Sequence, residues 1–125
     1  MPRNNLKPPG EAAKRQLFHK MKYQSTKERG YVWALSYEEF CSLTSNKCHY
    51  CGSEPSQIFN TVLRGKTMHN GDYVYNGIDR IDNTTGYLAV NCVSCCQVCN
   101  RAKRAMTYIE FVDWLKTIAN KWGKV

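Results

Sequence analysis

The chain has 125 residues, a length that predicts one domain. Its formal net charge is +8 at pH 7. It has no run of about 18 consecutive apolar residues, which excludes a membrane-spanning helix. Its start lacks the apolar segment of a secretory signal, so we expect the protein to stay inside the cell that makes it.

The N-terminal part of the sequence is basic and helical. A Pro-Pro-Gly run at 8–10 predicts a flexible basic arm over residues 1–10, followed by a single domain over residues 11–125. A narrow apolar stripe predicts a helix over residues 11–29, which Gly30 ends.

Two capping boxes mark the starts of further helices. Ser36 is followed by Glu39, and Thr107 by Glu110, the spacing at which side chain and backbone cap each other at a helix start. The second box opens residues 108–122, where apolar residues recur at helical spacing. We expect a broad apolar face there, made of Ile109, Phe111, Val112, Trp114, Leu115, Ile118 and Trp122.

The middle of the chain predicts strands. Asn70-Gly71 is a strong hairpin signal between residues 66–69 and residues 72–81. The run "NTTGY" at residues 83–87 predicts a second turn.

Positive charge gathers at two places in the sequence. Basic clusters of this kind suit a polyanion such as nucleic acid, and the alternative is a basic surface that only aids solubility. The residues that we expect to contact nucleic acid are Lys14, Arg15, Lys20, Lys22, Arg101, Lys103 and Arg104.

The cysteines predict a metal site. They form three Cys-x-x-Cys pairs, Cys48/Cys51, Cys92/Cys95 and Cys96/Cys99. Two such pairs can close a tetrahedral zinc site, because each turn directs two thiolates at one point. The spacing leaves open which of the last two pairs binds. Cys41 fits a helical core position, and His49 is expected to face solvent rather than the metal.

The order of these motifs resembles that of the HNH endonucleases, in particular the small zinc-containing members common in phage genomes. The resemblance lies in Cys-x-x-Cys, then "GIDRIDN" at residues 77–83, then "NCVSCCQVCNRAK" at residues 91–103. It implies an α+β fold, a small zinc-stabilised ββα-metal domain with flanking helices, in which a hairpin and a helix hold one divalent cation.

Site residues follow from this resemblance position by position. Asp79 matches the metal-binding aspartate, Asn91 the asparagine that supports the loop, and Asn100 the helical metal ligand. These positions imply Mg²⁺ or Mn²⁺ at Asp79 and Asn100. The zinc ligands implied by the resemblance are Cys48, Cys51, Cys96 and Cys99.

Arg80 departs from the family pattern, because it stands where the family has its catalytic histidine. Arginine keeps its proton at any working pH, so it cannot activate water, and we expect it to grip the scissile phosphate. His69 is the first candidate for the base, and a water activated without a protein base is the alternative. Asp82 is expected to cap the following turn.

The sequence thus predicts a metal-dependent HNH-type DNA endonuclease, with structural zinc and catalytic Mg²⁺ or Mn²⁺, that acts in the cytoplasm of a phage-infected host. The alternative is a zinc-containing nucleic-acid-binding module, derived from such a nuclease, that has lost catalysis. A zinc-held protein-interaction domain would explain the cysteines but not Asp79, Asn91 and Asn100.

Overall fold

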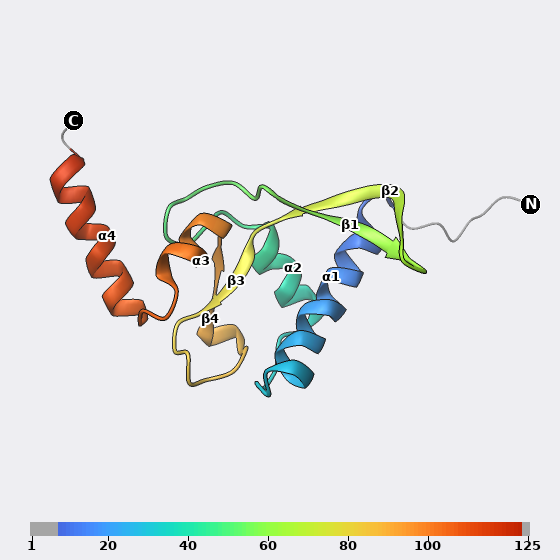
Figure 1. Cartoon of the computed structure of the whole chain (residues 1–125), viewed down its shortest axis with the longest axis horizontal. Helices are drawn as coiled ribbons and strands as arrows, with labels where there is room; N and C mark the ends of the chain where they lie inside the picture. The colour runs from blue at the N-terminus through green and yellow to red at the C-terminus, as the bar shows by residue number, and fades with distance from the viewer. Residues whose placement is uncertain (1–7, 124–125) are drawn as a thin grey trace, which may run out of the picture.

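Two small sheets and four α-helices make up the part of the chain that the computed structural model describes, residues 8–123; the side chains of residues 62–63 and 67–70 lie outside this description. In chain order the elements are α1 (Glu11–Tyr23), the π-helix η1 (Gln24–Glu28), α2 (Tyr37–Ser45), β1 (Gln57–Leu63), β2 (Lys66–Tyr75), β3 (Gly77–Arg80), the 3₁₀ helix η2 (Ala89–Asn91), β4 (Cys92–Cys95), α3 (Gln97–Lys103) and α4 (Tyr108–Trp122). The β1–β2 hairpin and α4 lie at opposite ends of the molecule (Figure 1). The predicted α+β class is confirmed.

A ββα unit occupies the centre of the molecule. Strands β3 and β4 pair antiparallel, with Asp79 opposite Val93 and Arg80 opposite Cys92. Helix α3 begins directly after β4, and the sulfur of its N-cap residue Cys96 accepts a hydrogen bond from the backbone N–H of Cys99 at 3.4 Å. The aspartate strand and the "CNRAK" helix are thereby brought side by side.

The predicted hairpin turn at Asn70-Gly71 is wrong. The turn between β1 and β2 is made by Arg64 and Gly65, whose φ angles are 53° and 77°. Gly71 lies inside β2, where the chain at Gly10 passes over it, and a Cβ on Gly71 would come within 2.6 Å of the Gly10 nitrogen. The glycine therefore serves a close backbone approach rather than a turn.

Gly10 itself is buried, while residues 1–7 of the predicted arm lie outside the described residues.

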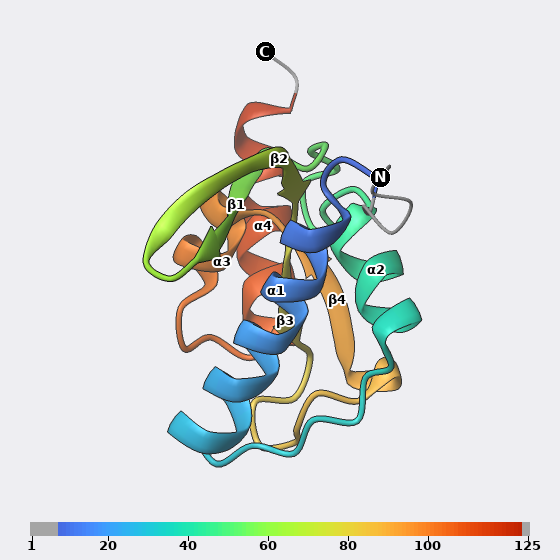
Figure 2. The ribbon, with the colours of Figure 1, turned by 90° about the vertical axis from the view of Figure 1, so that its right-hand side faces the viewer.

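The N-terminal helix packs against the β1–β2 hairpin and beside the ββα unit (Figure 2). Its buried residues are Ala13 and Leu17. Helical structure continues through η1 to Glu28, and Gly30 follows with a φ of 74°, so the predicted extent of this helix is confirmed. Both capping boxes are also present in full.

Helix α4 extends from one end of the molecule, as Figure 1 shows. Among the described residues of α4, Phe111 alone is buried, and it packs against Cys48, Cys95, Cys96 and Cys99. Ile109, Trp114 and Trp122 are 69%, 43% and 61% exposed, so most of the expected apolar face faces solvent. Among the described residues, no helix is both long enough and apolar enough to cross a membrane.

Candidate nuclease site

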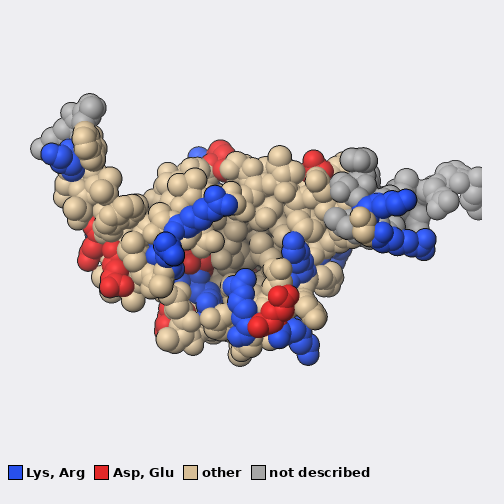
Figure 3. All heavy atoms as spheres, viewed as in Figure 1, with Lys and Arg blue, Asp and Glu red and all other residues tan. Residues whose placement is uncertain are grey.

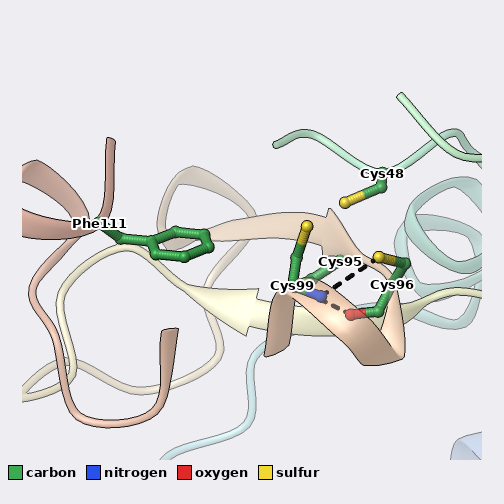
Figure 4. Close-up of a cluster of buried hydrophobic side chains, with 5 residues drawn as sticks. All are labelled: Cys48, Cys95, Cys96, Cys99 and Phe111. Atoms are coloured by element: carbon green, nitrogen blue, oxygen red, sulfur yellow. Dashed lines mark hydrogen bonds between the residues drawn. The ribbon is translucent and has the colours of Figure 1, made fainter. Parts of the chain in front are cut away.

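Four cysteines from two separate segments converge beside α3. Cys48 and Cys51 come from the turn after α2, and Cys96 and Cys99 from the start of α3; their sulfur atoms all lie within 4.8 Å of one another. Figure 4 shows the sulfurs of Cys48, Cys96 and Cys99 pointing into a common space. The Cys51 and Cys96 sulfurs are 3.6 Å apart, close to the spacing of about 3.8 Å that tetrahedral zinc–sulfur bonds of about 2.3 Å require. The donor set therefore fits zinc.

Cys92 and Cys95, the other predicted Cys-x-x-Cys pair, do not take part in this site. Cys95 is buried at 1% exposure next to Cys96, and Cys92 packs with Leu35 and Tyr87 in a second cluster. His49 lies outside the sulfur cluster, with its Nε2 2.8 Å from the hydroxyl of Tyr108.

The thiols of the cluster differ in their tendency to ionise. Burial acts to raise the pKa of Cys51, but hydrogen bonds from the side chain and backbone of Ser53 outweigh it and bring that pKa to about 6. Burial raises the pKa of Cys96 and Cys99 above the ordinary range. Because zinc binds thiolates, its binding must release protons from the buried pair.

A cavity of about 460 Å³ lies between α1 and η1 on one side and the ββα unit on the other. Asp79 and Asn100 both line it, and Asp79 is the one carboxylate among the described residues that do so. The cations that line it are Arg29, Arg80, Arg101 and Arg104. Figure 3 shows Lys and Arg atoms on both sides of a hollow near the centre of this face, between α3 and α1. The cavity thus combines oxygen ligands with a strongly cationic wall.

Asp79 is held by two partners that sequence analysis did not assign to it. The hydroxyl of Tyr50 donates to its Oδ2 at 2.6 Å, and the ammonium of Lys103 lies 3.2 Å from the same atom. Burial, and after it the hydrogen bond to Asp79, raises the pKa of Tyr50 well above its usual value, so the phenol keeps its proton. The sequence signal for Tyr50 was its place inside the first cysteine turn, between His49 and Cys51.

The assignment of Lys103 to the nucleic-acid surface is corrected by its burial. Its side chain is 1% exposed and its ammonium also contacts the Arg80 carbonyl oxygen at 3.4 Å. Lys103 follows Asn100 by one helical turn, so both face the β3 strand, and this ammonium is not available to a phosphate on the surface.

The Arg80 side chain lies along the loop that joins β3 to β4. Its Nη1 donates to the carbonyl oxygens of Asn83 and Thr85 at 3.0 and 3.2 Å. The guanidinium also stacks over Tyr31, with its carbon 3.8 Å from the ring centroid. These contacts fix the direction of the guanidinium at the cavity wall.

Asn91 ties the two ends of that loop together. Its Oδ1 accepts from the backbone N–H of Asp82 at 2.9 Å, and its Nδ2 donates to the carbonyl oxygens of Asp82, Thr85 and Gly86 at 3.1, 3.3 and 2.9 Å. The Asp82 carboxylate in turn accepts from the backbone and hydroxyl of Thr84, as expected of a turn cap, and these bonds lower its pKa. Asn91 and Asp82 therefore brace the loop whose carbonyl oxygens accept from the Arg80 guanidinium.

The four predicted nucleic-acid contacts of α1 do not line the cavity. Lys14 and Arg15 both pair with Glu11, at 3.4 Å each, and Arg15 also stacks on Tyr37. Lys20 lies over the ring of Phe59, and neither it nor the exposed Lys22 lines the cavity.

The predicted base cannot be placed beside Asp79. His69 belongs to β2, in the other sheet, and its side chain lies outside the described residues. No histidine is among the described residues that line the cavity.

Comparison with known proteins identifies the fold. No family model matches the chain. The rare-cutting HNH restriction endonuclease PacI has a similar structure, with a TM-score of 0.60 and 19% identity, over 98% of this chain and 94% of that one. An uncharacterised protein, R423 of Acanthamoeba polyphaga mimivirus, is 35% identical over 101 residues, which are 80% of this chain and 16% of that protein. The chain therefore has the fold of an HNH endonuclease, with four cysteines positioned for a metal, and spans about a sixth of its viral relative.

Proposed function

We propose that the protein is a zinc-stabilised, metal-dependent DNA endonuclease of HNH type that hydrolyses phosphodiester bonds. The observation that carries this proposal is that Asp79 and Asn100, both from the ββα unit, line one cavity, and that the wall of this cavity also holds four arginines. PacI, which has the same fold, is a DNA-cutting enzyme by its name. The viral relative supports the proposal that the protein works within a virus-infected cell.

Asp79 and Asn100 fit a hard divalent cation, because both offer oxygen ligands and Mg²⁺ retains waters and phosphate oxygens in its remaining positions. When bound, Mg²⁺ or Mn²⁺ supplies charge stabilisation for the phosphate and acidifies a bound water. Tyr50 and Lys103 fix the carboxylate of Asp79, and Asn91 keeps the loop after β3 in place. His69 stays a prediction for the base.

The four cysteines are proposed to hold Zn²⁺ as a structural ion. A site with four thiolates leaves no open position for chemistry. Its ligands join the turn after α2 to the start of α3, so the ion would fix α3, and with it Asn100, against the rest of the ββα unit.

The arginines of the cavity, rather than the basic residues of α1, are proposed to hold the DNA backbone. Arg101→Gln/Arg104→Gln should weaken duplex binding at least about tenfold and reduce the salt dependence of binding by nearly two phosphate contacts. Lys14→Gln/Arg15→Gln removes the same charge but should change affinity little, because Glu11 already pairs with both side chains. Fluorescence anisotropy with a labelled duplex at several salt concentrations measures both, and equal losses in the two variants would refute this placement.

Arg80 is proposed to clamp the scissile phosphate through the donors left free by its loop contacts. Arg80→Lys should lower the cleavage rate at least about tenfold, since a lysine keeps the charge but loses the fork of donors. Tyr31→Leu is the matched control, because it removes the stacking partner and leaves the fork. If Arg80 only braced the loop, the loss of activity in Arg80→Lys would follow the loss of melting temperature, and Tyr31→Leu would be impaired as much.

Incubation of the zinc-loaded protein with supercoiled plasmid tests the function as a whole. Nicked or linear DNA with Mg²⁺ or Mn²⁺, and none with the cation withheld, is the expected result. A protein that retards DNA on a gel but cuts with neither cation would instead be the binding module, which the cationic cavity also fits.

A further inference from the structure

Lys103 places a buried positive charge directly against the proposed cation ligand. Its Nζ lies 3.3 Å from Oδ1 and 3.2 Å from Oδ2 of Asp79, and 3.4 Å from the carbonyl oxygen of Arg80. The two side chains are 1% and 10% exposed. Among the described residues, Asp79 is the one carboxylate in an ion pair with this ammonium.

This charge works against a divalent cation at the same carboxylate. Asp79 supplies one negative charge, whereas Lys103 and the arginines of the cavity already place several positive charges around it. Like charges a few ångströms apart repel strongly where solvent is partly excluded. Without another anion, the site has a surplus of positive charge before any metal binds.

We propose that Lys103 is the internal counter-ion of the cation site: it holds the Asp79 carboxylate in place in the DNA-free protein and weakens divalent-cation binding there, so that the cation binds tightly only together with a DNA phosphate. This inference rests on the proposed nuclease function and concerns its regulation. The phosphate adds the missing negative charge, and cation and DNA then raise each other's affinity by the same factor, as linkage requires.

Tyr50 provides the matched neutral comparison. It contacts the same carboxylate, with its hydroxyl 2.6 Å from Oδ2, but carries no charge. Loss of either side chain loosens Asp79. Only loss of Lys103 also removes the repulsion, so loss of Lys103 should raise cation affinity and loss of the Tyr50 hydroxyl should not.

The test is a Mn²⁺ titration of the zinc-loaded protein at pH 8, followed by electron paramagnetic resonance, without DNA. Lys103→Met should bind Mn²⁺ about tenfold more tightly than the wild type, or more, whereas Tyr50→Phe should bind it equally or less tightly. With a hydrolysis-resistant phosphorothioate duplex present, the gain in Mn²⁺ affinity should be larger for the wild type than for Lys103→Met. Lys103→Gln, which keeps a hydrogen-bond donor without charge, serves if the methionine variant fails to fold.

Asp79→Asn separates failure of this inference from failure of the proposed function. Mn²⁺ binding that depends on Asp79 but is unchanged or weakened in Lys103→Met and Lys103→Gln would overturn the counter-ion role alone. Mn²⁺ binding that is the same in Asp79→Asn and the wild type, with or without DNA, would refute the cation site itself and with it the nuclease proposal.

Discussion

Asp79→Asn protein is expected to cleave supercoiled plasmid at least about 10³-fold more slowly than the wild type, because the asparagine lacks the charge that holds a catalytic divalent cation. Asp79 is the one carboxylate among the described residues that line the cavity, so none of these can replace it as a charged ligand. Cleavage is measured as the rate of nicked and linear product at saturating Mg²⁺.

Asparagine is preferred to alanine at this position because of the buried ion pair. Asp79→Ala would leave the Lys103 ammonium, at 1% exposure, without its carboxylate partner, a change that costs about 3–5 kcal/mol of stability. Asparagine retains an acceptor for Tyr50 and Lys103.

Asp82→Asn is the matched control, since Asp82 is exposed and bonds within its own loop through Thr84 and Thr85. It should keep activity within a few-fold of the wild type. Cleavage by Asp79→Asn at the wild-type rate, with an intact melting curve, would contradict the assignment of Asp79 as the metal ligand.

Removal of zinc is expected to unfold the ββα unit. Structural zinc sites contribute on the order of 10 kcal/mol to folding, which is comparable with the whole stability of a typical domain, about 5–15 kcal/mol. Excess chelator, or Cys51→Ser, should therefore abolish the cooperative thermal transition and release the zinc. Circular dichroism and metal analysis by mass spectrometry measure the two effects.

Cys41→Ser is the control, because Cys41 lies on α2 outside the sulfur cluster. It should keep one zinc per chain and a melting temperature within a few degrees of the wild type. A chelated protein that still melts cooperatively at the wild-type temperature would refute a structural role for the metal.

The same site predicts the direction of the pH dependence. Burial raises the pKa of Cys96 and Cys99, and zinc must compete with the protons on these thiols. Zinc-dependent stability is therefore present at high pH and is lost as pH falls, because the protons displace the metal.

Local signals in the sequence determined much of this protein. The capping boxes at Ser36 and Thr107 form within four residues of chain, so the partners of each hydrogen bond can be identified from the sequence alone. The Cys-x-x-Cys turns are equally local, and the resemblance to HNH endonucleases selected Cys96 and Cys99 for the second pair, which the structure brings to Cys48 and Cys51. The resemblance to HNH endonucleases also implied the α+β fold class, which the structure confirms.

The tertiary structure alone decided what surrounds Asp79. Gly71 was misread because its neighbour Gly10 is distant in sequence and close in space. Tyr50 and Lys103 reach Asp79 from 29 and 24 residues away, and Lys103 is buried only because α3 packs against β3. The sequence shows that Arg101, Lys103 and Arg104 are basic but not where their side chains point. Packing of α3 directs Lys103 inward onto the Asp79 carboxylate and leaves Arg101 and Arg104 lining the cavity.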